Sequence, residues 1–191
     1  MVTMLFIFDF DSTLVNLDIP WGEVRKEIIA YGESEGFDID PENHLVTISN
    51  HISDTPERKA EVDRIFRKYE KKAVEEGKFT VYAPTVPILS TLRNMGHKVA
   101  IASNNTEHTI KEILEAGEIP ADAIRGRTSV ERPKPFGDMI NSLMEEFSSP
   151  KGETFMIGDN FWDEGAGAAA GIKTFIIKPG TLDISLFEGI L

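Results

Sequence analysis

Residues 4–13 read Met-Leu-Phe-Ile-Phe-Asp-Phe-Asp-Ser-Thr, so a continuous apolar run comes directly before two aspartates. Such a run is typical of a strand that is buried on both faces of a parallel sheet. Similar runs recur at 98–102, 154–157 and 174–177, with helical patterns between them. Strands that alternate with helices predict an α/β fold, a Rossmann-like open parallel sheet flanked by helices. Ligand sites on such sheets lie beyond the carboxyl ends of the strands.

Three helical patterns lie between these runs. Apolar residues recur at 86–92, before a stop at Gly96, and at 110–114, before a stop at Gly117. The third pattern is an apolar stripe over 136–147, and Pro135 stands where a first-turn proline would. These patterns supply the helices that an open parallel sheet needs as cover.

The stretch 16–79 interrupts the alternation and predicts a small helical cap inserted after the first strand. We expect two helices there, the first opening at Pro20 and ending by Gly32 and Gly36, the second opening at Thr55-Pro56. The predicted domains are therefore an α/β core of residues 1–15 and 80–191 and a cap of residues 16–79. A helical pair in this place could act as a lid over the strand ends.

The second cap helix carries a densely charged face. The interpretation we favour is a solvated helix surface with ion pairs between neighbouring turns. The alternative is that one or two of its cations face a ligand; the candidates are Arg58, Lys59, Arg64 and Arg67.

Composition excludes several functional classes. The 191 residues include 32 Asp and Glu against 20 Lys and Arg, a net charge of −12, which disfavours nucleic acid and anionic membranes as partners. The absence of Cys excludes a disulfide scaffold, thiolate zinc sites and a cysteine nucleophile. No apolar run approaches the ~20 residues of a membrane helix, and the start of the chain lacks the features of a signal peptide. We expect a cytoplasmic protein.

Asp9 and Asp11 follow the first strand directly. On an extended segment, side chains two residues apart point the same way. Two carboxylates held close together are costly unless a cation compensates them, and Mg²⁺ is the usual cation beside phosphate. The alternative is an Asp-rich turn that closes the strand.

Three further polar elements follow predicted strands or lie near a sheet edge. Two carboxylates, Asp159 and Asp163, come after the run 154–157, although this segment could also be a loop with Asn160 as a helix cap. Ser103-Asn104-Asn105 could cradle a phosphate at the start of a helix, or only cap that helix. Lys134 lies between two prolines, which would hold a cation in place unless it is a solvent-exposed loop residue.

Taken in order, these elements resemble the motifs of the haloacid dehalogenase-like hydrolase superfamily. The family pattern is Asp-x-Asp-x-Thr after a buried strand, a Ser or Thr after the next core strand, a Lys, and Gly-Asp-x-x-x-Asp. The resemblance covers about residues 3–15 and 80–180 and includes a helical cap between the first two motifs. The matching residues are Asp9, Asp11, Thr13, Ser103, Lys134, Gly158, Asp159 and Asp163.

The resemblance implies a role for each matching carboxylate. Asp9 would be the nucleophile that forms an aspartyl-phosphate, and Asp11 would be the general acid and base. Mg²⁺ would be held by Asp9, the backbone carbonyl of Asp11, and Asp159. Asp163 would orient Asp159 or a water molecule on the metal.

The remaining motif residues complete the implied site. Ser103 and Lys134 would bind the phosphoryl oxygens, with Asn104 in the same cradle. Thr13 would support the loop. Family members that act as dehalogenases or phosphonatases lack an Asp at the position of Asp11, so the resemblance favours phosphate-ester hydrolysis.

We therefore expect a Mg²⁺-dependent phosphomonoester hydrolase of a small phosphorylated metabolite, acting as a monomer or homodimer. A phosphomutase or phosphotransferase on the same core is an alternative. A non-catalytic receiver-like signalling module is a further one, although receivers carry their phosphorylated Asp on a later strand and lack the insertion. The sequence does not identify the substrate; the candidate cap contacts are Asn16, Trp21, Arg25, His51 and Arg58.

Overall fold

The computed structural model describes residues 2–191, which separate into two compact units. One unit consists of the residues up to Leu17 together with Phe79–Leu191, and the other is Asp18–Lys78. The first holds all of the motif residues, and the second is the inserted segment.

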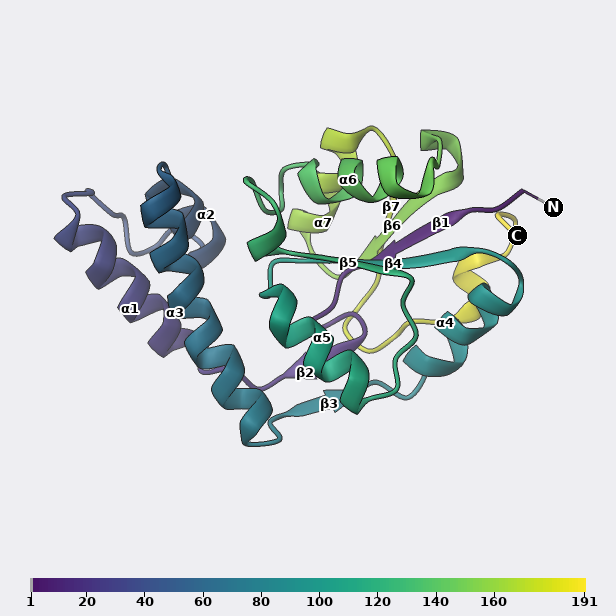
Figure 1. Ribbon diagram of the computed structural model, residues 1–191, viewed down its shortest axis with the longest axis horizontal. Helices are drawn as coiled ribbons and strands as arrows, with labels where there is room; N and C mark the ends of the chain where they lie inside the picture. The colour runs from purple at the N-terminus through teal and green to yellow at the C-terminus, as the bar shows by residue number, and fades with distance from the viewer. Residues whose placement is uncertain (1) are drawn as a thin grey trace. The chain divides into compact units, whose positions relative to one another are not determined.

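The first unit is built on a parallel sheet, which confirms the predicted Rossmann-like α/β fold (Figure 1). Helices α6 and α7 cover one face, and α4 and α5 cover the other. The strand order is β5-β4-β1-β6-β7. The strands are β1 Leu5–Phe8, β4 Lys98–Ser103, β5 Ala123–Gly126, β6 Thr154–Gly158 and β7 Lys173–Ile176; the helices are α4 Thr85–Asn94, α5 Glu107–Ala116, α6 Asp138–Phe147 and α7 Phe161–Ala170.

Strand β1 occupies the middle of the sheet, with all four of its residues fully buried. Its last residue, Phe8, pairs with Ile101 of β4 and with Ile157 of β6. The Asp9 amide continues this ladder with a 2.8 Å hydrogen bond to the Ile157 carbonyl. The register therefore brings the residues that follow β1, β4 and β6 to one edge of the sheet.

Two features of the first unit differ from the prediction. Strand β5 was missed, because it is a short edge strand in which only Gly126 is fully buried and no apolar run marks it. The expectation that Pro135 lies in the first turn of a helix over 136–147 was wrong. Helix α6 begins at Asp138, after an N-cap at Gly137, and Phe136 lies before it with 40% exposure.

The small residues of α7 pack as predicted. A Cβ built on Gly167 would lie 1.8 Å from Thr174 Oγ1 of β7, and one on Gly165 would lie 2.9 Å from Pro135 Cβ. Only glycine fits at these two positions, so the helix can approach both the sheet and the segment that carries Lys134.

A two-stranded antiparallel sheet, β2 Val15–Leu17 with β3 Phe79–Val81, leaves and re-enters the first unit. Asn16, one of the candidate substrate contacts, pairs with Thr80 in this two-stranded sheet. Neither strand was predicted, because three residues carry too little periodicity to stand out.

The second unit contains three helices where two were predicted: α1 Trp21–Ser34, α2 Leu45–Ile52 and α3 Pro56–Glu75. Gly32 does not end α1, which continues to Ser34. A Cβ on Gly32 would lie 2.3 Å from Ile39 Cδ1 and 2.6 Å from Ile52 Cδ1. Gly32 instead lets the helices pack closely. Thr55 caps α3, as expected, with its hydroxyl accepting from the Arg58 amide.

Most of the candidate ligand cations of the second unit have partners inside that unit. Arg58 pairs with Asp54 and Glu35, and Arg64 pairs with Glu61. Lys59 pairs with Asp63. Arg25 donates to the carbonyls of Pro41 and Asn43 and so holds the connection between α1 and α2. These pairs agree with the interpretation of a solvated, ion-paired surface.

Two aromatic candidates of the second unit also contact neighbours within it. The His51 ring meets Phe37 edge-on at 5.2 Å, and Trp21 lies 6.5 Å from Phe66. Both contacts are packing contacts between elements of this unit.

His97 makes the first unit sensitive to acid. Its side chain is 4% exposed, and its Nδ1 accepts a 3.2 Å hydrogen bond from the Met4 amide. Burial lowers the pKa of His97. As the pH falls below about 6.5, the unfolded chain takes up this proton before the folded chain does, so the stability contributed by neutral His97 is lost.

His97→Asn keeps an acceptor for the Met4 amide but cannot be protonated. We expect its melting temperature to fall less than that of the unaltered protein between about pH 7.5 and pH 5.5. Thermal unfolding at both pH values checks this. Equal falls in the two proteins would contradict it.

Candidate active site

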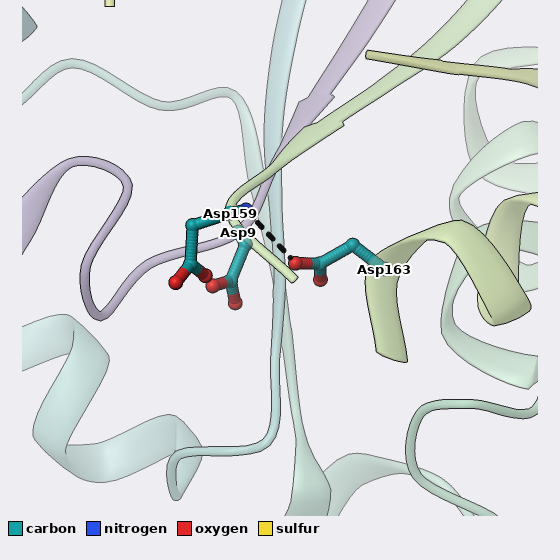
Figure 2. Close-up of side chains that lie close together, drawn as sticks. All are labelled: Asp9, Asp159 and Asp163. Carbon is teal, nitrogen blue, oxygen red and sulfur yellow. Dashed lines mark hydrogen bonds between the residues drawn. The ribbon is translucent and has the colours of Figure 1, made fainter. Parts of the chain in front are cut away.

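Three carboxylates gather at the carboxyl edge of the sheet (Figure 2). Asp9 follows β1, Asp159 follows β6, and Asp163 lies in the first turn of α7. Each offers an oxygen within 4.8 Å of the others'. Asp9 is 4% exposed and Asp163 is fully buried. Parallel register thus brings together acids that are about 150 positions apart in the chain.

Lys134 is the cation of this cluster. It is 2% exposed, and its Nζ lies 2.6 Å from Asp9 Oδ1 and also donates to Asp163 Oδ1. Burial by itself would lower the pKa of Lys134, but the charges of Asp163 and Asp9 outweigh burial and raise that pKa above its ordinary value. Lys134 therefore stays charged, and the alternative of a solvent-exposed loop lysine was wrong.

Asp163 folds back over the turn that leads into α7. Its Oδ2 accepts from the amides of Asp159 (3.1 Å) and Asn160 (3.3 Å). A Cβ on Gly158 would lie 2.2 Å from the Asp163 carboxyl group, so only glycine permits this arrangement. Burial and then the charge of Asp9 raise the pKa of Asp163 above its usual range, and Lys134 opposes them.

Asp159 is the more open member of the cluster. The Asn160 amide group donates to Asp159 Oδ1 at 2.8 Å, and Asn160 Oδ1 caps α7 by accepting from the Trp162 amide, as predicted. Burial and the charge of Asp9 raise the pKa of Asp159. The helix cap and the acidic cluster share one short turn.

Asp11 lies outside the three-carboxylate cluster. Its Oδ1 accepts a 2.9 Å hydrogen bond from the Leu17 amide in β2, after a turn in which Ser12 has a φ of 67°. That Asp9 and Asp11 point the same way stays a prediction, because the turn at Ser12 lies after both residues. Burial raises the pKa of Asp11 to about 7, with smaller upward contributions from Asp9 and Asp159 and opposition from the Leu17 hydrogen bond.

Ser103 and Asn104 follow β4, beside the cluster. Ser103 Oγ donates to Asn105 Oδ1 at 2.9 Å, and the Asn104 side chain donates to the Lys134 carbonyl at 3.0 Å. Asn104 Oδ1 is buried without a partner among residues 2–191. Helix α5 begins only at Glu107, so Ser103, the last residue of β4, and Asn104, in the loop after it, lie before the first turn of that helix.

Sequence reasoning missed the residue that supports this loop. A Cβ on Gly126 would lie 2.5 Å from the Glu107 amide nitrogen and 2.8 Å from the Asn105 carbonyl oxygen. The Arg127 amide donates to that carbonyl at 2.9 Å. The glycine that ends β5 therefore lets β5 approach the Ser103 loop, but a lone Gly after an unpredicted strand offers no signal in the sequence.

Thr13 is fully buried, and its hydroxyl has no hydrogen-bond partner in the part of the chain that the structure describes. The amide of Thr13 donates to the Phe10 carbonyl within the turn at 3.4 Å. Thr13 is thus a residue of the turn and not of the carboxylate cluster.

The donor set suits a hard divalent cation. Three carboxylates share one lysine, so the buried cluster carries excess negative charge, and carboxylate oxygens are the ligands that such cations prefer. The residues present therefore fit a divalent metal ion.

The sequence matches the family model described as haloacid dehalogenase-like hydrolase over residues 6–177. The chain belongs to this family. The match spans most of the chain and contains every motif residue from Asp9 to Asp163. The resemblance stated from the motifs is confirmed.

Named relatives include phosphatases of two kinds. A pyrophosphatase PpaX of Halalkalibacterium halodurans is 29% identical over 124 residues, 64% of this chain and 57% of the relative. A phosphoglycolate phosphatase of Aquifex aeolicus is 27% identical over 194 residues, 95% of this chain and 87% of the relative. The chain thus spans little more than half of the first relative and most of the second.

Solved structures share the fold. A hydrolase from Pseudomonas syringae superposes with a TM-score of 0.65 at 21% identity, covering 98% of this chain and 90% of that one. CbbY from Rhodobacter sphaeroides, in complex with phosphate, superposes with a TM-score of 0.65 at 17% identity, covering 93% and 87%. Within residues 2–191, none of the helices combines the length and apolar character needed to cross a bilayer.

Proposed function

We propose that this protein is a Mg²⁺-dependent phosphomonoester hydrolase that acts on a small phosphorylated metabolite through an aspartyl-phosphate on Asp9. The observation that carries the proposal is the placement of Asp9. It ends the central strand, is held by Lys134, and lies within a cluster of two further carboxylates. A buried carboxylate held by a lysine is positioned to attack an electrophilic phosphorus.

The reaction would proceed in two displacements. In the first, a carboxylate oxygen of Asp9 bonds to phosphorus while the bond from phosphorus to the ester oxygen breaks. In the second, water bonds to phosphorus, the bond to Asp9 breaks, and inorganic phosphate leaves. Asp9 returns to its starting form, so the cycle consumes only ester and water.

Asp11 would move the proton in both displacements. It would give a proton to the departing ester oxygen and then take one from the attacking water. A pKa of about 7, raised by burial, suits a group that must both give and take a proton near neutral pH. Its separation from the three-carboxylate cluster supports this division of work, because a carboxylate on a cation stays ionised.

Ser103, Asn104 and Lys134 would bind the phosphoryl oxygens. Lys134 already neutralises Asp9, so the nucleophile and the transferred group would share one cation. The hydrogen bond from Asn104 to the Lys134 carbonyl ties the phosphate loop to the lysine segment. Thr13 would support the turn that carries Asp11.

Mg²⁺ would be held by Asp9, Asp159 and the backbone carbonyl of Asp11, with Asp163 fixing the Asp159 turn through the two amide hydrogen bonds. When bound, the cation supplies positive charge that neutralises the carboxylates and the phosphoryl group.

The substrate class rests on the relatives and on charge. Relatives named pyrophosphatase and phosphoglycolate phosphatase make inorganic pyrophosphate and phosphoglycolate the first two compounds to test. The net charge of −12 supports a small substrate over nucleic acid or a membrane. We further propose that the Asp18–Lys78 unit acts as a lid, that the protein is cytoplasmic, and that it works as a monomer or homodimer.

The test is a panel of phosphorylated metabolites that includes both compounds, assayed for phosphate release. We expect release with Mg²⁺, loss after chelation with EDTA, and recovery when Mg²⁺ is returned. Formation of an isomeric phosphate ester without release of phosphate would indicate a mutase instead. Release that is unaffected by chelation would contradict the role of the metal.

A further inference from the structure

Tyr82 is a polar residue to which the motifs give no role. It follows β3 and is only partly buried. Its hydroxyl makes no hydrogen bond with any residue in 2–191. A partly exposed phenol of this kind can donate to water or to a ligand.

The backbone places Tyr82 beside the turn that carries Asp11. The Tyr82 amide donates to the Leu14 carbonyl at 3.1 Å, and the Thr85 hydroxyl donates to the same carbonyl at 2.7 Å. Strand β3, directly before Tyr82, pairs with β2, whose Leu17 amide holds the Asp11 carboxylate. The Tyr82 backbone and the Asp11 carboxylate are therefore both held by the two-stranded sheet β2-β3 and the turn that precedes it.

The ring of Tyr82 also reaches the loop that follows β7. A Cβ on Gly180 would lie 3.0 Å from Tyr82 Cε1, and Gly180 has a φ of 69°. Earlier in the same loop, the Ile177 amide donates to the Gly158 carbonyl, one residue before Asp159. The ring therefore packs against the loop that follows β7, the strand beside β6.

Electrostatics agrees with this position. Burial, then the charges of Asp11 and Asp159, raise the pKa of Tyr82 above its ordinary value. The phenol therefore stays neutral at physiological pH and keeps its proton. It is a hydrogen-bond donor on which the charges of Asp11 and Asp159 act.

We infer that Tyr82 is a substrate-binding residue that donates a hydrogen bond to an oxygen of the leaving group. It rests on the proposed function, because the leaving group is the alcohol part of a phosphomonoester. Asp11 is the group proposed to protonate the ester oxygen. Its carboxylate is held by β2, and Tyr82 directly follows β3, the strand paired with β2. The inference selects substrates whose alcohol part carries a hydroxyl or carboxylate oxygen next to the ester.

A cycle of two proteins and two substrates tests the inference. The proteins are the unaltered chain and Tyr82→Phe, which keeps the ring against Gly180 and removes only the hydroxyl. The substrates are glycerol 1-phosphate and propyl phosphate, which share a three-carbon chain but differ in their free hydroxyls. Hydrolysis with Mg²⁺ gives kcat/KM for the four combinations.

We expect Tyr82→Phe to lower kcat/KM for glycerol 1-phosphate about tenfold, the worth of one hydrogen bond, and to leave propyl phosphate within about twofold. A merely structural role would lower both values by the same factor. Equal factors, or no change for either ester, would overturn the inference while the proposed function stands.

Failure of the proposed function has a different signature. It is failure of the unaltered protein to release phosphate from any ester with Mg²⁺. The Tyr82 inference is then tested by calorimetric binding of the same two esters to the Asp9→Asn protein and to the Asp9→Asn/Tyr82→Phe protein. Weaker binding of glycerol 1-phosphate alone in the double variant supports the inference, and any other pattern overturns it.

Discussion

Asp9→Asn should reduce phosphate release from every substrate at least about a thousandfold, because an amide cannot form the acyl phosphate. The change keeps the size of the side chain and removes one negative charge from a cluster of three carboxylates around one lysine. The fold should therefore survive. Phosphate release from p-nitrophenyl phosphate and from the best metabolite of the panel, with Mg²⁺, measures the effect.

Asp38→Asn is the matched control, since Asp38 is an exposed acid of the Asp18–Lys78 unit, outside the proposed reaction. It should retain full activity, and both variants should unfold in the same cooperative way as the unaltered protein. Under rapid quenching, the unaltered protein should gain the mass of one phosphoryl group and Asp9→Asn should not. An active Asp9→Asn protein would exclude Asp9 as the nucleophile.

Most of the strands that the sequence predicted are fully buried and therefore consist of consecutive apolar residues; β7, at the edge of the sheet, was predicted although none of its residues is fully buried. Strand β1 and most of β4 and β6 are buried on both faces, so they read as apolar runs. Strand β5 at the edge of the sheet, the eight-residue helix α2 and the three-residue strands β2 and β3 have no such signature. These elements are too short, or too partly buried, to leave a recognisable apolar pattern in the sequence.

The sequence predicted which residues meet at the candidate site, but not how their side chains contact one another. Parallel strands bring their carboxyl ends to one edge, so Asp9, Ser103 and Asp159 were expected together. The contact of Lys134 with both Asp9 and Asp163 depends on a loop whose path no pattern describes. The inward fold of Asp163 depends on the missing side chain of Gly158.

The position of Asp11 shows the same limit. Spacing of two residues places two carboxylates on one side only while the backbone stays extended. The turn at Ser12 comes after Asp11 and leads into β2, where the Leu17 amide holds the Asp11 carboxylate. A three-residue strand that no pattern in the sequence marks therefore supplies a hydrogen-bond partner of the proposed acid and base.

Asp11→Asn should divide substrates by their leaving groups. An alkyl ester needs a proton on its departing oxygen, so kcat for such a substrate should fall about a hundredfold to ten-thousandfold, the usual worth of a general acid. p-Nitrophenol leaves as a stable anion, so the first displacement with p-nitrophenyl phosphate should be nearly unaffected. Single-turnover release of nitrophenol measures that displacement apart from the second one.

The same variant should slow the second displacement, because Asn cannot take a proton from the attacking water. With p-nitrophenyl phosphate, Asp11→Asn should therefore release one equivalent of nitrophenol in a burst and then turn over slowly, with phosphorylated Asp9 accumulating. The unaltered protein, whose Asp11 has a pKa of about 7 because of burial, should carry far less phosphorylated Asp9 near neutral pH and show no burst. An equal loss of rate for both kinds of ester, without a burst, would mean that Asp11 acts only through its hydrogen bond with the Leu17 amide of β2. The burst therefore separates proton transfer by Asp11 from its structural contact.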